Sequence, residues 1–227
     1  MTTPAPTIET SGPEIYDVEL EHSLLEANAQ LARQNRELLD HYNTTAVDFM
    51  GAMGSGKTSL IAKLADVFKD KTGVAIFSDD ATIIPQVDAL AGQGVPVVQI
   101  GAPGGDQLDA KLVAKGLHEI DLREIGFVFV EHSGGVFCPA ACPIGSKTRV
   151  VVVSVSEGPS IVKQHPHLFF GADIVVINKI DVIDVMEANL DELSRDIRTL
   201  KPDIKIIPMS CLTGAGLEDV ESALLAI

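Results

Sequence analysis

Residues 51–59 read GAMGSGKTS, and this stretch decides the fold. It matches the pattern of Gly, four residues, Gly, Lys and then Ser or Thr, and it lies between the apolar run AVDFM and a stretch with helical periodicity. Glycines let the backbone form a concave nest of N–H groups that bind phosphate oxygens, and the following helix N-terminus adds partial positive charge. The stretch therefore predicts a bound nucleoside triphosphate, held by Gly51, Gly54, Ser55, Gly56, Lys57, Thr58 and Ser59.

Short β-branched runs alternate with helical patterns on both sides of this loop. The runs are AVDFM, VAIFS, PVVQI, FVFVE, RVVVVSV, DIVVIN and KIIPM, and most of the stretches between them have a helical apolar stripe. Strands that are apolar on both faces and separated by helices form a parallel sheet covered on both sides. The sequence therefore predicts an α/β, doubly wound, mostly parallel P-loop NTPase fold.

The chain ahead of the loop divides into two parts. Residues 1–15 are rich in Thr, Pro and Glu, which predicts a disordered lead-in before a single domain of residues 16–227. From about residue 18 to 41 leucines recur at near-helical spacing, which predicts an amphipathic helix packed on the body of the protein. The predicted stripe consists of Leu20, Leu24, Leu31 and Leu38, widened by Leu25 and Leu39.

Composition narrows the class of partner. A formal net charge of −15 over 227 residues disfavours binding to nucleic acid or to an anionic membrane surface. No basic residue precedes an apolar stretch at the start, and the apolar runs are far shorter than the ~20 residues of a membrane helix. Three cysteines cannot form a fully paired disulfide framework. We therefore expect a cytoplasmic protein with protein or cation partners.

A second motif identifies the base. NKID, residues 178–181, follows the run DIVVIN, and a carboxylate at Asp181 can accept from both the ring N–H and the exocyclic amine of guanine. Asn178 and Lys179 belong to the same motif. The strand end PMSCLTG places Ser210 and Cys211 where backbone amides meet the guanine oxygen, and for Cys211 a structural role is favoured over a metal role. These positions at strand ends predict a GTP site.

Two carboxylates are predicted to lie near the phosphates. Asp79 follows the run VAIFS and Glu131 ends FVFVE, so both are expected to hold Mg²⁺ or its waters together with Thr58. With Lys57, which reaches the outer phosphates, they form the predicted catalytic set. Asp80 competes with Asp79 for this role, and a helix N-cap is the alternative for any one carboxylate here.

Taken in order, these motifs resemble the GTPases that assist nickel incorporation during hydrogenase maturation, and more distantly the urease accessory GTPases. The resemblance runs from about Leu24 to the C-terminus, through LLEANAQLARQNRELL, GAMGSGKTS, SDDAT with Asp79 and Thr82, VPVVQIGAPGGDQLDA, EHSGGVFCPA, SVSEG, NKID and SCLTG. It implies slow hydrolysis of GTP to GDP and phosphate, and a homodimer favoured by GTP. It also implies a metal near the dimer interface that is released to a nickel-enzyme precursor or another accessory protein.

The resemblance also implies a metal-binding cysteine before a proline, and Cys138-Pro139 stands at that position. Where the family has an adjacent Cys-His pair before LDA, this sequence has Asp106-Gln107. Thiolate and imidazole ligands bind Ni²⁺ and Zn²⁺ more tightly than a carboxylate and an amide do. The site is therefore predicted to be weaker, or to be rebuilt with Cys142 and His132. The alternative is that Cys138 and Cys142 are ordinary packed thiols.

Three functions are compatible with these motifs. The first is a GTP-hydrolysing metallochaperone for a nickel enzyme, and retained Cys138 favours it. The second is a GTP-dependent interaction switch that has lost the metal, and Asp106-Gln107 favours it. A small-molecule kinase is disfavoured by NKID, because kinases rarely require guanine recognition. His165 and His167 are interpreted as loop residues around Pro166.

Overall fold

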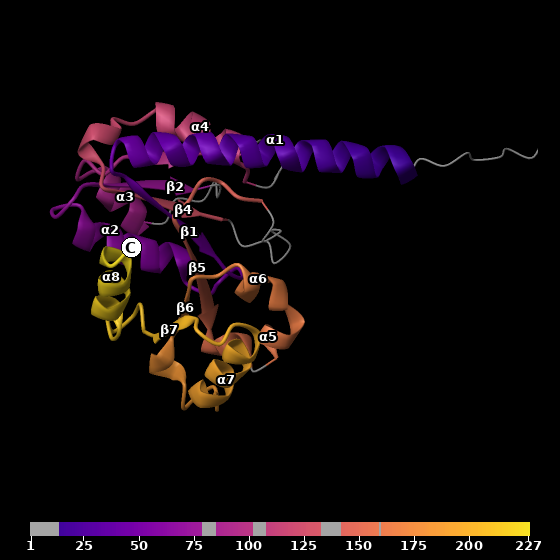
Figure 1. The fold of residues 1–227 in the computed structure, drawn as a ribbon. Coiled ribbons are helices and arrows are strands. Elements are labelled where there is room, and N and C mark those ends of the chain that lie inside the picture. The colour runs from indigo at the N-terminus through magenta and orange to yellow at the C-terminus, as the bar shows by residue number, and fades with distance from the viewer. Residues whose placement is uncertain (1–13, 79–84, 102–107, 133–141, 159) are drawn as a thin grey trace, which may run out of the picture.

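Seven parallel strands form one sheet in the computed structural model, which describes residues 14–78, 85–101, 108–132, 142–158 and 160–227 (Figure 1). The strand order is β3-β2-β4-β1-β5-β6-β7. Each of the seven predicted runs forms one of these strands, so the predicted sheet is confirmed. The strands are β1 (Thr45–Met50), β2 (Val74–Ser78), β3 (Val97–Gln99), β4 (Phe127–Glu131), β5 (Thr148–Ser154), β6 (Ile174–Asn178) and β7 (Lys205–Pro208).

Helices cover both faces of the sheet, as a doubly wound fold requires (Figure 1). One face carries α2 (Lys57–Phe68), α3 (Pro85–Ala91) and α8 (Leu217–Leu225). The other face carries two groups: α1 (Glu14–His41) with α4 (Ala110–His118), and α5 (Ile161–Gln164), α6 (Pro166–Phe170) and α7 (Leu190–Leu200). The described residues also form short 3₁₀ helices η1 (Leu122–Glu124), η2 (Val155–Glu157) and η3 (Ile180–Val182). No helix in the described ranges is long and apolar enough to cross a membrane.

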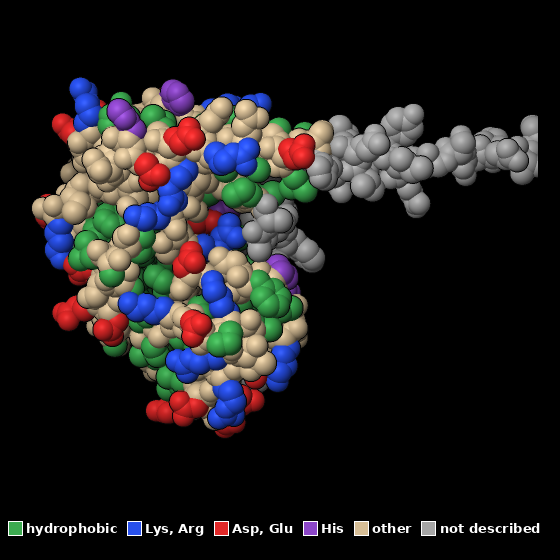
Figure 2. Space-filling model, viewed as in Figure 1, with side chains coloured by type: hydrophobic (Ala, Val, Ile, Leu, Met, Phe, Trp, Pro, Cys, Tyr) green, Lys and Arg blue, Asp and Glu red, His purple; other side chains and the backbone are tan. Residues whose placement is uncertain are grey.

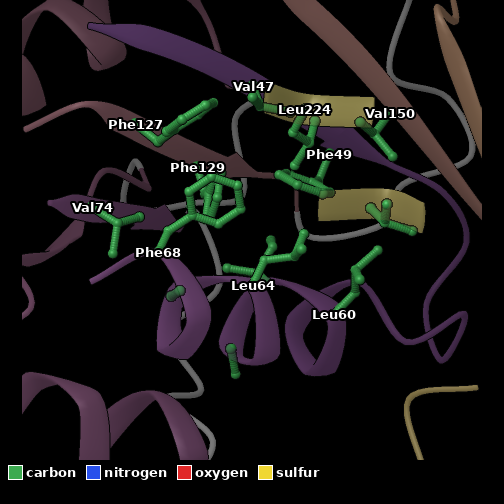
Figure 3. Packing of buried hydrophobic residues seen from close by; sticks show 14 of the residues in the cluster. Val47, Phe49, Leu60, Leu64, Phe68, Val74, Phe127, Phe129, Val150 and Leu224 are labelled. Carbon is green, nitrogen blue, oxygen red and sulfur yellow. The ribbon is translucent and has the colours of Figure 1, made fainter. Parts of the chain in front are cut away.

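An aromatic cluster fixes α2 against the centre of the sheet (Figure 3). Phe49 of β1 and Phe129 of β4 meet edge to face, with ring centroids 5.5 Å apart. The ring of Phe68 in α2 is tilted against that of Phe127, and their centroids are 4.6 Å apart. Such tilted and edge-to-face pairs add stabilisation beyond the burial of their area. Because α2 begins directly after the Gly-rich loop, this packing also fixes the loop at the carboxyl edge of β1.

The N-terminal helix α1 is longer than the surface it covers. It begins at Glu14, inside the predicted lead-in, and its 28 residues span about 42 Å. Leu39 is buried, whereas Leu24 is 61% and Leu25 46% exposed. The predicted leucine stripe is therefore wrong for Leu24 and Leu25, because α1 extends beyond the body of the protein at that end (Figure 1).

A buried ionic cluster lies on the same face, between the two groups of helices. Asp48 of β1 is fully buried, its Oδ2 accepts from Arg149 Nε at 2.9 Å, and its Oδ1 lies 2.5 Å from His132 Nε2. Burial raises the pKa of Asp48, but His132 and Arg149 outweigh burial and hold that pKa below its ordinary value. Arg149 also lines a cavity of about 470 Å³ beside α1, and Figure 2 shows Lys and Arg side chains at the hollow below this helix.

The Asp48→Asn variant is expected to lose about 3–5 kcal/mol of unfolding free energy, because it leaves two buried partners without their countercharge. Urea denaturation at pH 7 measures the loss. The control is Asp66→Asn, which removes an exposed ion pair with Lys69 and should change the unfolding midpoint little. Equal midpoints for the two variants would contradict a structural role for the cluster.

Candidate nucleotide-binding site

The Gly-rich loop has a backbone that requires glycine at two points. Gly51 has φ 143° and Gly56 has φ 100°, both in the region that side chains disfavour. A Cβ on Gly51 would lie 2.1 Å from the carbonyl oxygen of Val152, and one on Gly56 would lie 2.1 Å from Asn178 Nδ2. Gly54, at φ 81°, has open space around it. The loop therefore packs closely against Val152 at one end and Asn178 at the other, which only glycine allows.

Polar groups converge on this loop. Lys57 is 5% exposed, and its Nζ donates to the carbonyl oxygens of Gly51 at 2.9 Å and Ala52 at 3.0 Å. The ammonium group is thus held over the loop. Ser55 is fully buried, and its Oγ has no hydrogen-bond partner among the described residues. A cation and a buried hydroxyl at a concave backbone suit the oxygens of a phosphate chain.

Asn178 joins the three predicted nucleotide motifs. Its side chain is buried, Nδ2 donates to the carbonyl oxygen of Ser55 at 2.9 Å, and Oδ1 accepts from the backbone of Cys211 at 3.0 Å. Lys179 adds a second link, because its Nζ donates to the carbonyl oxygen of Gly54 at 2.7 Å. The loop 51–59, NKID and SCLTG therefore meet at one edge of the sheet, as the sequence predicted.

A cavity of about 680 Å³ opens beside this junction. Asp181 lines it, and its Oδ1 accepts a hydrogen bond from Ser210 Oγ. Ser210 Oγ in turn accepts from the backbone of Leu212 at 3.2 Å and Thr213 at 3.1 Å. One carboxylate oxygen of Asp181 is thus anchored by the loop after β7. Gly56, Ser59, Asn178, Lys179 and Cys211 also line the cavity.

The sequence did not predict the residues that form one wall of this cavity. Its lining includes Lys63 and Asp66 of α2, together with Gln86, Leu90 and Gln93 from α3 and the turn after it. No motif marks these residues. Helical periodicity separates the polar face of α2 from its apolar face, but only the packing of α3 against α2 brings Gln86 and Gln93 to the cavity.

The predicted Mg²⁺ ligands Thr58 and Glu131 are in contact. Glu131 is 4% exposed at the end of β4, its Oε1 accepts from Thr58 Oγ1, and its Oε2 accepts from Ser78 Oγ at 3.5 Å. A threonine hydroxyl and a carboxylate are hard oxygen ligands of the kind that Mg²⁺ takes. Asp79, which follows Ser78, lies outside the described residues, as do Asp80 and Thr82.

The predicted transition-metal ligands are only partly described. Cys138, Pro139, Asp106 and Gln107 lie outside the described ranges. His132 is buried against Asp48, and Cys142 is half-buried ahead of Pro143. Within those ranges no group of three or more His, Cys, Asp and Glu side chains is placed to hold a metal ion. His165 precedes α6 and His167 lies inside it, with their ring centroids 5.9 Å apart. The interpretation as loop residues is therefore wrong for His167.

Cys211 allows a chemical test of the cavity. Burial raises the pKa of its thiol above the ordinary 9.0, so alkylation by iodoacetamide at pH 8 should be slower than for N-acetylcysteine and should accelerate as pH rises. GDP at about 100 times its Kd should slow the reaction about 100-fold, because Cys211 lines the cavity. Mass spectrometry of the Cys211 peptide measures both effects, with the Cys142 peptide as an internal control. Alkylation unaffected by GDP would place the nucleotide elsewhere.

Three comparisons with known proteins point to the same family. Residues 45–208 match the family described as "CobW/HypB/UreG, nucleotide-binding domain". The chain is 36% identical over 203 residues to "Probable hydrogenase maturation factor HypB" of Methanocaldococcus jannaschii, a match that covers 89% of this chain and 92% of that protein. The structure of hydrogenase maturation factor HypB from Archaeoglobus fulgidus matches with a TM-score of 0.83 and 31% identity, covering 88% of this chain and 98% of that one.

A second solved structure, HypB from Helicobacter pylori in complex with nickel, matches with a TM-score of 0.79 and 29% identity, covering 88% of this chain and 94% of that one. The resemblance predicted from the motifs is confirmed by these matches and by the fold. The chain therefore belongs to the CobW/HypB/UreG family of nucleotide-binding proteins.

Proposed function

We propose that this chain is a GTPase that acts as an accessory protein for nickel insertion into a hydrogenase or a similar nickel enzyme. The observation that carries the proposal is the junction at Asn178, which links the phosphate loop, NKID and SCLTG beside a cavity that Asp181 lines. The relatives add support: several are named hydrogenase maturation factors, and one was solved in complex with nickel. We further propose a cytoplasmic location and a homodimer favoured by GTP.

The proposed reaction transfers the γ-phosphoryl group of GTP to water. The water oxygen bonds to the γ-phosphorus, the bond to the β-phosphate oxygen breaks, and GDP and phosphate leave. Lys57 and the loop amides stabilise the charge that develops on the phosphoryl oxygens. Asp181 selects guanine, and Asn178, Lys179, Ser210 and Cys211 complete the base site. Glu131 and Asp79 lie at the phosphate end.

Thr58, Glu131 and Asp79 are proposed to hold Mg²⁺. The contact between Thr58 and Glu131 brings two oxygen ligands together at the start of α2, which supports this assignment. When bound, the ion neutralises negative charge on the β- and γ-phosphate oxygens.

Nickel is proposed to bind near the segment that follows β4. Cys138 lies seven residues after Glu131 in the sequence, so ordering of the chain around the γ-phosphate changes the geometry of the thiol segment. Cys142 and His132 are the other proposed ligands for Ni²⁺ or Zn²⁺. The contact of His132 with Asp48 supports this role, because metal-binding histidines commonly place their other nitrogen against a carboxylate. The cargo would pass to a nickel-enzyme precursor or another accessory protein.

A GTP-dependent interaction switch without metal is the second candidate. It is favoured by Asp106-Gln107, since these residues replace two strong ligands with weaker ones.

Equilibrium dialysis with Ni²⁺ and Zn²⁺ separates the two functions. Wild type and Cys138→Ala are compared with and without a non-hydrolysable GTP analogue. Tight binding that depends on nucleotide and is lost in Cys138→Ala supports the nickel function. Cys211→Ala, measured without nucleotide, is the matched control and should bind metal like wild type, because Cys211 lies in the base cavity. An absence of metal binding in both nucleotide states favours the switch.

A further inference from the structure

The cavity of about 470 Å³ beside α1 is basic, although the protein as a whole is strongly acidic. One side of the cavity is lined by α1 and another by residues 143–149. Four of the 17 Lys and Arg residues of the chain line this one cavity, while the formal net charge of the chain is −15. These four are Arg33, Arg36, Lys147 and Arg149, and Figure 2 shows Lys and Arg side chains at the hollow. The cavity therefore suits an anionic ligand.

The four cations form two rows on different elements. Arg33 and Arg36 are three residues apart on α1, so they are neighbours on the helix surface, with about 5–6 Å between their Cβ atoms. Lys147 and Arg149 lie on either side of the buried Thr148 in extended chain, so they project to the same side, about 6.6 Å apart. The charge of the cavity is therefore spread along its length.

Three of these cations are available to a ligand. Arg33 and Lys147 are exposed, and neither makes an ion pair with any residue in the described part of the chain. Arg36 pairs with Asp40 at 3.2 Å, but this pair is exposed and such pairs contribute little. Arg36 Nη1 also donates to the carbonyl oxygen of Gly145 at 3.5 Å, which holds its guanidinium group toward the opposite row.

The acidic groups near the cavity leave this positive charge in place. Arg149 is balanced by the buried Asp48, to which its Nε donates at 2.9 Å. Asp173 also lines the cavity, but its Oδ2 accepts from the backbone N–H of Arg149 at 2.9 Å and its Oδ1 lies 3.9 Å from Lys201 Nζ. The excess positive charge is therefore that of the two α1 arginines and Lys147.

We propose that this cavity binds an extended acidic segment of a protein partner. Side chains on one side of an extended peptide are about 6.6 Å apart, which is the spacing of the row beside β5. Charges spread over two elements suit several carboxylates along a chain better than one compact anion, and guanidinium groups can bind carboxylates through two hydrogen bonds. Small residues of the lining, Ala29, Ala32, Gly145 and Gly171, leave room for the peptide backbone. This surface goes beyond the proposed nickel function and does not depend on it.

The test measures binding of a fluorescein-labelled hexaglutamate peptide by fluorescence anisotropy, with GDP present so that the phosphate loop is occupied. Wild type should bind hexaglutamate but not a hexaglutamine peptide of the same length. Arg33→Ala and Lys147→Ala should each weaken the affinity for hexaglutamate about 3- to 5-fold, as expected for a partly solvated ion pair. Reversing both charges, in Arg33→Glu with Lys147→Glu, should weaken it by at least about 10-fold.

The helix α7 offers a matched control. Arg195 and Arg198 are exposed and three residues apart, as are Arg33 and Arg36 on α1, but they line a different surface. The double variant Arg33→Ala with Arg36→Ala should therefore weaken peptide binding, whereas Arg195→Ala with Arg198→Ala should bind the peptide like wild type. All variants should keep the wild-type GDP affinity and thermal unfolding midpoint.

Four outcomes would overturn the proposal. The first is a wild-type protein that does not bind hexaglutamate, and the second is an equal loss in the α7 control, which would indicate diffuse attraction. The third is tripolyphosphate that binds more tightly than hexaglutamate and depends on Arg33, because the ligand would then be a phosphate compound. The fourth is self-association of wild type in sedimentation that the charge reversal abolishes, because a second copy would then occupy the cavity. If the charge-reversal variant fails to fold, the alanine variants decide.

Discussion

Replacing Lys57 with alanine is expected to slow GTP hydrolysis about 100- to 1,000-fold at saturating GTP. Lys57 is the buried cation at the phosphate loop, where its ammonium group is held by the carbonyl oxygens of Gly51 and Ala52. Removing one group that stabilises developing charge in such a site has an effect of this size. Phosphate release in a single turnover measures the rate of the chemical step separately from product release.

Two further variants assign the effect to charge. Lys57→Met keeps the length of the side chain, so a loss equal to that of Lys57→Ala would identify the ammonium group as the cause. Lys69 lies just beyond the end of α2 and pairs with Asp66 at the surface, so Lys69→Ala should hydrolyse GTP at the wild-type rate. Unchanged hydrolysis in Lys57→Ala would refute the assignment of the phosphate loop.

Replacing Asp181 with asparagine is expected to move the nucleotide preference from GTP toward XTP, by on the order of 10⁴-fold. The carboxylate can accept from both donors on the Watson–Crick edge of guanine, whereas the amide offers one acceptor and one donor. Ser210 already donates to Oδ1 of Asp181. In the variant Ser210 can keep that bond with the amide oxygen, which turns the amide nitrogen toward the carbonyl oxygen of xanthine.

Competition between GDP and XDP for a fluorescent nucleotide measures this preference directly. Asp184→Asn is the matched control, because Asp184 is exposed three residues later and lines a different surface. The nucleotide preference of Asp184→Asn should match that of wild type. A variant of Asp181 that still prefers GDP would show that another group reads the base.

Much of this site follows from short motifs. The loop 51–59 and NKID are contiguous, and their geometry comes from glycine conformations and strand ends, which are local properties. The sequence therefore predicted the strands, the position of the loop at the start of α2, and the meeting of the NKID segment with that loop, which Asn178 and Lys179 make. It also predicted that Thr58 and Glu131 would lie close together, because parallel strands end at one edge of the sheet.

The leucine stripe on α1 shows that periodicity alone does not predict which residues are buried. Leu24 and Leu39 have the same hydrophobicity and belong to one helix, yet Leu24 is 61% exposed and Leu39 is 1% exposed. Periodicity predicts which face of a helix is apolar, but it does not predict how much of that face another element covers. That depends on the lengths and positions of α4 and the sheet.

The sequence by itself determined the α/β class, the phosphate loop, the guanine motif and the family, because each is encoded by neighbouring residues whose conformation is set locally. Only the tertiary structure decided the rest. Asn35 meets Ile144 across 109 residues, Arg149 meets Asp48 across 101, and α3 forms a wall of the cavity that Asn178 and Asp181 line. These contacts depend on how helices pack on the sheet, and a single sequence does not specify which distant polar groups that packing will bring together.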